Sequence, residues 1–159
     1  MNRPIIIDFK IALEKAARYC AYQERCQWDL GRKLKDWNID PELHDDIIVE
    51  MIQQNFINEE RYASNFVSGK INIKKWGRKK IRLELQQRQI SNYSINKALE
   101  SIDEEKYIVN LRHWIEKKTE SIVANSSYER RAKLFHYLLS KGFESNLINE
   151  ELNNYGITG

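Results

Sequence analysis

Residues 78–99 read RKKIRLELQQRQISNYSINKAL, and their apolar positions follow a spacing that occurs three times in the chain. The spaced residues of this stretch are Ile81, Leu85, Ile90 and Leu99, with separations of four, five and nine. The same separations relate Leu30, Leu34, Ile39 and Ile48, and again Leu134, Leu138, Phe143 and Leu152. Repetition at a period of about 50 residues indicates a tandem array of one structural unit.

The spacing within each copy predicts a pair of packed helices. The first two apolar residues lie one helical turn apart, as on a helix with one buried face, and the third closes a short turn before a second helix. The 159-residue chain has six Gly and two Pro and is rich in Lys, Glu, Leu and Ile, which favours helix. We therefore predict an all-α protein, an elongated tandem array of three three-helix, helix-turn-helix-like repeats.

Helix-start signals divide this array. Asp8, Asn58 and Asp103 are suited to accept hydrogen bonds from the free amides of a helix start, and two carboxylates follow each of the last two. Pro41 marks a further start inside the first repeat. These signals place the repeats at residues 8–55, 58–102 and 103–156.

Other signals mark the ends of helices inside the repeats. Ser126 and Glu129 fit a capping box, and Gly142 follows the next helix where a left-handed residue is expected. The connections 68–75 and 117–127 absorb the length differences between repeats, so we expect loops there, and loops often carry function.

A strongly basic segment spans residues 70–88. It holds eight Lys and Arg and one acid, Glu84, a net charge of +7 in a chain whose total is +3, so the remaining residues carry −4. Its aromatic residue, Trp76, stands among cations that can meet phosphates while the ring stacks or anchors. The candidate contacts for a polyanion or an acidic protein are Lys70, Lys74, Lys75, Trp76, Arg78, Lys79, Lys80, Arg82 and Arg88. A solvated helix end with Trp76 in the core is an equally good interpretation.

Signals of catalysis are missing from the sequence. The three histidines are isolated from one another, and no Gly-rich phosphate loop occurs. Cys20 and Cys26 have no further Cys or His at metal-ligand spacing, so we interpret them as ordinary half-buried thiols. We expect no enzymatic activity, no metal and no cofactor. The longest apolar run, residues 5–7, is too short for a signal peptide or a membrane span, so we expect a cytoplasmic protein.

Three runs of the middle repeat carry a family resemblance. Residues 56–63 (FINEERYA), 76–85 (WGRKKIRLEL) and 90–99 (ISNYSINKAL) resemble the central signature of the RecX family of bacterial regulatory proteins. The helix 25–34 and the turn at Gly142 also match, so the resemblance covers most of the chain. One departure is the joint 58–60, where Asn-Glu-Glu replaces the family's acidic pair and keeps the capping chemistry.

The resemblance implies a function. Proteins similar to this chain are tandem three-helix repeats that act on the recombinase RecA. The resemblance implies binding in the groove of the RecA filament on single-stranded DNA, which limits filament extension and lowers ATPase and recombinase activity in DNA repair and the SOS response. The implied partners are the RecA filament and single-stranded DNA, within or apart from the filament, for a protein that we expect to be monomeric.

The competing hypothesis is a helix-turn-helix regulator that reads duplex DNA. The expected helix 78–88, its short turn and the helix 94–101 support it, with basic residues close by. The second helix has few side chains suited to reading base edges. In addition, the cations cluster on the helix before it. Phosphate contact without sequence readout is the better interpretation of this pair. A plain helical scaffold that binds neither DNA nor RecA is the third alternative.

Overall fold

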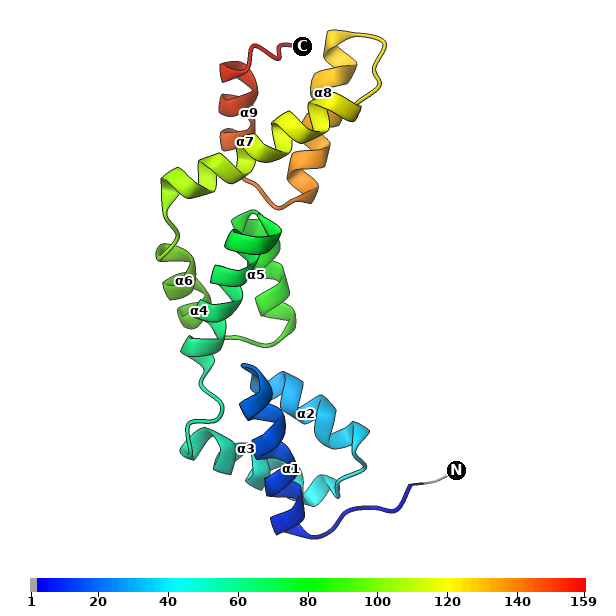
Figure 1. The fold of residues 1–159 in the computed structure, drawn as a ribbon, viewed down its shortest axis with the longest axis vertical. Helices are drawn as coiled ribbons and strands as arrows, with labels where there is room; N and C mark the ends of the chain where they lie inside the picture. The colour runs from blue at the N-terminus through cyan, green and yellow to red at the C-terminus, as the bar shows by residue number, and fades with distance from the viewer. Residues whose placement is uncertain (1–2) are drawn as a thin grey trace.

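The computed structural model describes residues 3–159 and arranges them as three helical units along one axis, with the two ends of the chain at opposite ends of the molecule (Figure 1). The first unit holds α1 (Phe9–Tyr22), α2 (Gln27–Asp36), the 3₁₀ turn η1 (Pro41–Leu43) and α3 (His44–Gln53). The second holds α4 (Glu59–Gly69), which continues into the π-helical turn η2 (Lys70–Lys74), then α5 (Arg78–Gln87) and α6 (Asn92–Glu100). The third holds α7 (Glu104–Ser121), α8 (Ser127–Ser140) and α9 (Ser145–Asn154). The predicted all-α array of three three-helix repeats is confirmed.

The predicted caps begin the first helix of each unit. The Asp8 carboxylate accepts from the Ile11 amide at 3.1 Å, and the Asn58 side chain accepts from the Arg61 amide at 2.9 Å. Asp103 accepts from the amide two residues ahead at 3.0 Å. Each side chain therefore satisfies an amide that a helix start leaves without a main-chain partner.

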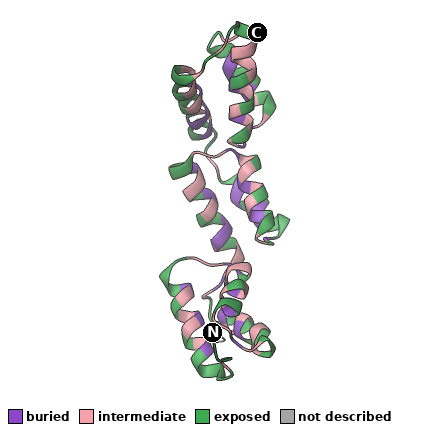
Figure 2. Ribbon diagram, turned by 90° about the vertical axis from the view of Figure 1, so that its right-hand side faces the viewer, coloured by how far each residue is buried: buried purple, intermediate pink, exposed green. Residues whose placement is uncertain are grey.

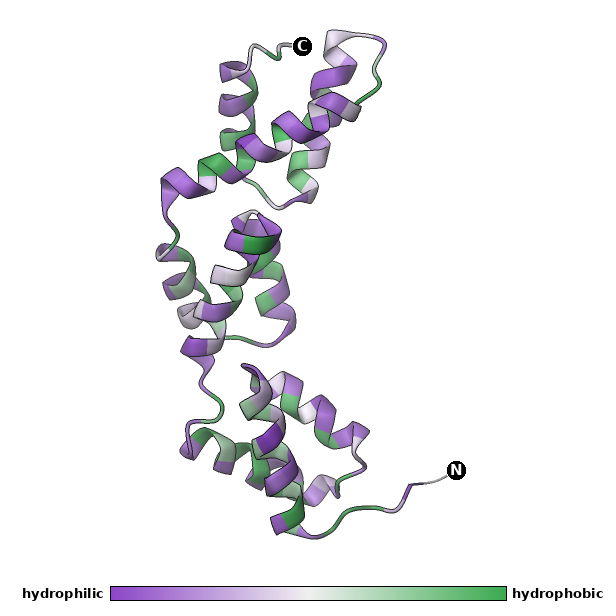
Figure 3. Cartoon of the chain, in the orientation of Figure 1, coloured by the Kyte–Doolittle hydropathy of each residue, from purple (hydrophilic) through white to green (hydrophobic). Residues whose placement is uncertain are grey.

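The repeated apolar residues form the core. Buried segments occur on helices of all three units (Figure 2). The first two positions of every copy are fully buried, namely Leu30, Leu34, Ile81, Leu85, Leu134 and Leu138. Along each helix, hydrophobic and hydrophilic residues alternate as expected for one buried face (Figure 3). The prediction that the fourth position is buried is wrong in the first unit. Ile48 is only half-buried there, and Ile47 and Met51 are buried instead. A 3₁₀ turn winds more tightly than an α-helix, so η1 rotates the buried face of α3 by about one residue.

Two of the predicted loops are largely helical. The connection 68–75 contains the end of α4 and the turn η2, and Lys75 then adopts a left-handed conformation with φ 56°. The connection 117–127 is helical up to Ser121. Only the segment 122–126 is irregular there, so both loops are shorter than the sequence predicted.

The second and third units share one core. Buried residues from α4 to α9 form a single cluster, which also receives Cys26 and the partly buried Trp28 from the start of α2. The rest of the first unit packs around its own cluster, which includes Leu30, Leu34 and Ile47. The units are therefore repeats in sequence, but the last two form one packed body.

The second and third units meet backbone to backbone at a contact that we call the glycine seam. The Gly77 amide donates to the Lys141 carbonyl at 2.7 Å, and the Lys79 amide donates to the Gly142 carbonyl at 3.0 Å. A Cβ on Gly77 would lie 2.1 Å from the Gly142 carbonyl carbon, and Gly142 itself has φ +97°. Both positions therefore need glycine, Gly77 for the close approach and Gly142 for the approach and for the left-handed conformation.

Side chains of α7 satisfy carbonyls that the π-helical turn leaves free. Asn110, which is buried, donates to the Ile71 carbonyl at 2.9 Å, and the Trp114 indole donates to the Lys75 carbonyl at 2.8 Å. The Tyr107 hydroxyl accepts from the Arg78 amide at 3.0 Å and donates to Glu144. The irregular backbone of the second unit thus depends on the third unit for its hydrogen bonds.

Replacing Leu85 by Ala should lower the free energy of unfolding by about 2–5 kcal/mol, because the side chain is fully buried and its loss leaves a cavity. Leu83 on the same helix is 60% exposed, so Leu83→Ala is the matched control and should change it by less than about 0.5 kcal/mol. Denaturant melts of both variants test this. Equal effects would contradict the assignment of the buried face.

Replacing Gly77 by Ala should destabilise the chain by about 1–3 kcal/mol or more, because the new methyl group overlaps the backbone of the third unit. Gly77 has φ −79°, so alanine suits its conformation and the clash alone is measured. In the control Gly31→Ala, the methyl group meets no atom within 4 Å inside α2, which predicts unchanged or slightly higher stability. A Gly77→Ala protein that melts like the parent would contradict the seam.

Candidate polyanion-binding surface

The predicted basic residues lie beside the glycine seam, on η2, on α5 and on the turn between them. This placement brings Arg78, Lys79 and Lys80 to the boundary between the second and third units, whereas Lys70, Lys74 and Arg88 also face the first unit. The first amides of α5 are already bonded to Tyr107 and to the Gly142 carbonyl. The start of α5 therefore contributes its positive dipole to the surface, while its first amides are not available to a ligand.

The two terminal arginines of α5 are neutralised by carboxylates. Arg78 pairs with Glu144 at 2.8 Å and also with Glu104, which ties the second unit to the third. Arg88 pairs with Glu84 at 2.9 Å. Half-buried ion pairs of this kind hold the structure together and leave less charge for a partner.

Lys70 and Lys80 are placed differently, because both lie against Trp76. Their ammonium groups lie 4.6 Å and 4.5 Å from the centre of the indole ring. Trp76 is half-buried and packs on the shared core, so its ring anchors this segment while two ammonium groups lie over it. An aromatic ring positions an ammonium group without cancelling its charge.

The third unit extends this arrangement with lysines that the sequence analysis missed. Lys141 lies 4.0 Å and Lys117 5.5 Å from the Trp114 ring centre, and Lys118 lies 4.8 Å from that of Tyr137. We call Lys70, Lys80, Lys117 and Lys141 the lysine ribbon. None of the four pairs with a carboxylate within residues 3–159.

The lysines of the ribbon influence one another. Partial burial, followed by the charges of Lys80 and Lys117, lowers the pKa of Lys141 below its ordinary value. Burial and then the charges of Lys74 and Arg88 lower the pKa of Lys70 in the same way. Like charges that are held together repel one another, and an anion that approaches them offsets this repulsion. The ribbon is therefore suited to a polyanion.

The remaining candidates surround the ribbon. Lys74 and Lys79 are exposed, and Arg82 is half-buried on α5. Lys75 contributes its carbonyl to Trp114, so its backbone has a structural role. The surface is open and basic, and within residues 3–159 no three His, Cys, Asp or Glu side chains gather as a metal site. No helix in the same range is long and apolar enough to cross a membrane.

A signal for one missed residue exists in the repeat itself. Lys141 follows Leu138 by three residues, as Arg88 follows Leu85, so both close the equivalent helix with a cation. Lys117 and Lys118 carry no such signal, because they lie in a segment that we expected to be a loop. Only the packing of α7 against the seam brings them beside Lys141.

Comparison with known proteins agrees with the fold and with the predicted resemblance. A family model for the second three-helix domain of RecX matches residues 58–99, and one for the third matches residues 104–152. The regulatory protein RecX of Bacillus cytotoxicus is 27% identical over 134 residues, and that of Bacillus mycoides is 25% identical over the same length. These regions are 84% of this chain and 50% of each relative, so the chain spans about half the length of the curated relatives it matches.

Two crystal structures share the architecture. One of a regulatory protein RecX has a TM-score of 0.82 and 26% identity, and covers 89% of this chain and 70% of that one. RecX from Lactobacillus salivarius has a TM-score of 0.80 over 94% of this chain and 97% of its own, and at 23% identity it supports the fold alone. The two domain models together match more than half of the sequence, and with these relatives they establish that the chain belongs to the RecX family.

Proposed function

We propose that this protein binds the RecA filament and restrains its extension, ATPase and recombinase activity during DNA repair. The observation that carries the proposal is the lysine ribbon on an elongated chain of the RecX family, because a long basic surface suits a long anionic partner. The protein acts by binding rather than by catalysis, as a monomer in the cytoplasm. The modules of this activity are residues 8–55, 58–102 and 103–156.

The shape supports contact with several protomers of a filament. The three units follow one another along the long axis of the molecule (Figure 1). Linked contacts that are weak one by one add up through effective concentration, provided that the partner offers a matching row of sites. A helical polymer offers such a row, whereas a single RecA protomer does not. The single-stranded DNA inside the filament is the natural ligand of the ribbon.

Sequence-specific reading of duplex DNA has weaker support. On α6, the helix that would enter the major groove, the lone cation Lys97 pairs with Glu60 at 3.1 Å. Tyr93 on the same helix is exposed, but the unpaired lysines lie on η2, on α5 and in the third unit. Their position suits contact with phosphates more than with base edges.

Changing Lys74, Lys79 and Lys80 together to Gln should weaken co-sedimentation with preformed RecA filaments by about tenfold or more, because three unpaired positive charges are lost. Binding by the parent should fall more steeply with added salt than binding by the variant. The control changes Lys10, Lys35 and Lys106, three exposed lysines outside the segment, and alters the net charge equally. Equal loss in both variants would exclude the basic segment from the interface.

The protein should also bind assembled filaments at least about tenfold more tightly than monomeric RecA, since only the polymer engages all three units. Titration of labelled protein with RecA, with and without single-stranded DNA and nucleotide, measures this ratio. Free DNA is the control that separates binding to the strand from binding to the recombinase. A ratio near one would replace the extended contact by a single site on one protomer.

A further inference from the structure

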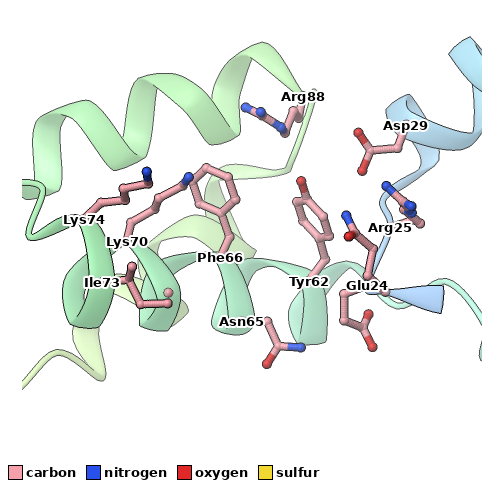
Figure 4. Close-up of a pocket in the computed structure, with 12 residues that line it drawn as sticks. Glu24, Arg25, Asp29, Tyr62, Asn65, Phe66, Lys70, Ile73, Lys74 and Arg88 are labelled. Carbon is pink, nitrogen blue, oxygen red and sulfur yellow. The ribbon is translucent and has the colours of Figure 1, made fainter. Parts of the chain in front are cut away.

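A cleft of about 470 Å³ lies where the first unit meets the second, outside the lysine ribbon except for Lys70 (Figure 4). One face of α4 and η2 forms its floor, since Tyr62, Phe66 and Lys70 follow at intervals of four residues. The start of α2, the segment before it and the end of α5 form the walls. This volume lies within the range of sites for small molecules.

One end of the cleft is cationic. Lys70 and Lys74 point to the same side of Phe66, and Arg88 lies above that ring (Figure 4). Arg88 is paired with Glu84, but neither lysine pairs with a carboxylate within residues 3–159. Two adjacent ammonium groups without a counter-charge favour a compact anion with several oxygens, such as a phosphate group.

The middle of the cleft is aromatic and apolar. The Tyr62 and Phe66 rings stack at 6.1 Å with an angle of 30° between their planes. Ile73 is 76% exposed and lies on the rim beside the two lysines (Figure 4). The Lys70 ammonium and the Arg88 guanidinium each lie 5.1 Å from the centre of the Phe66 ring, so a flat ligand ring would lie beside them, against Phe66 and Tyr62, and would remove apolar surface from water.

The opposite end presents hydrogen-bond acceptors. Glu24 and Asp29 stand there, beyond Tyr62 and away from Lys70 and Lys74 (Figure 4). Glu24 pairs with Arg61 at 2.6 Å, and Asp29 accepts from the Cys26 amide at 3.1 Å. Arg25 is held over the Tyr19 ring at 3.9 Å. These carboxylates repel a second anionic group but accept hydrogen bonds from amino or hydroxyl groups.

We propose that this cleft binds one nucleoside phosphate unit. The phosphate lies between Lys70 and Lys74, the base lies against Phe66 and Tyr62, and its donor groups face Glu24 and Asp29. The unit comes either from a free nucleotide or from one residue of a single strand, and both sources share this chemistry. An acidic peptide fits less well, because its next carboxylate would meet Glu24 or Asp29. The proposal concerns the chain alone and does not depend on RecA.

The test is an NMR titration of the ¹⁵N-labelled full chain with adenosine 5′-monophosphate. Amide shifts should saturate and should map to residues 62–74 and to the start of α2. Adenosine and inorganic phosphate, each carrying half of the ligand, should bind at least about tenfold more weakly. Lys70→Gln with Lys74→Gln should weaken binding of the nucleotide by a similar factor, whereas Lys10→Gln with Lys106→Gln, which alters the net charge equally at exposed sites, should leave it unchanged.

Two further ligands separate the sources and the alternatives. If an oligothymidylate of eight residues shifts the same amides at a tenfold lower concentration, the unit belongs to a strand; if it binds no better than the mononucleotide, the site is for free nucleotides. Absence of saturating shifts with both ligands overturns the proposal, as does equal weakening in the control variant. Tighter binding of hexaglutamate at these amides overturns it in favour of an acidic peptide. The titration of the unmodified protein does not depend on the folding of any variant. Amide shifts that map elsewhere on the chain would therefore be enough to refute the site.

Discussion

The close approach of Gly77 to the turn at Gly142 is the constraint on which the surface of this molecule depends. Two backbone hydrogen bonds cross that contact, and neither glycine can accept a methyl group without moving the other chain segment. The contact brings the start of α5 against the end of α8, which places Lys80 close to Lys141. Without it, the cations of the two units would belong to separate surfaces.

Aromatic rings allow a concentrated charge to exist on a stable fold. A lysine paired with a carboxylate loses most of its attraction for a partner, and a lysine in open water loses side-chain entropy when it binds. Lys80 on Trp76 and Lys141 on Trp114 avoid both costs, because each ring restrains the ammonium group and leaves its charge intact. Arg78, by contrast, is committed to Glu144 and Glu104 and holds two units together. One basic segment thus serves two purposes, because Arg78 joins two units while Lys80 keeps an unpaired charge.

Local signals in the sequence were reliable wherever a residue acts on its own backbone. Asp8, Asn58 and Asp103 cap the helices they precede, and Gly142 adopts the left-handed conformation expected after α8. The apolar repeat also predicted the core, since a spacing of four on a helix leaves little choice of buried face. The first repeat deviates at Ile48 because the turn that begins at Pro41 is a short 3₁₀ helix, and this winding changes the phase of α3.

The sequence was least informative where two units act on each other. The π-helical turn is stable because Asn110 and Trp114, about 39 residues away in the chain, satisfy its carbonyls. No local sequence pattern indicates a partner that is so distant in the chain, so segment 68–75 was expected to be a loop. The candidate residues Arg78 and Lys80 look alike in the sequence, but Glu144 neutralises the first and Trp76 positions the second.

In the proposed function, these differences determine how the open basic surface would discriminate between partners. Each ring-supported lysine would contribute a modest, salt-dependent attraction to the proposed partner, so no single contact would decide binding. The glycine seam fixes the spacing of the lysines on both sides of it, and a partner gains their sum only when its charges follow the same path. Because the second and third units share one core, this spacing is set by the fold and not by a flexible linker. A chain with the same composition but a mobile joint between Gly77 and Gly142 would keep the charge and lose the fixed spacing of the lysines.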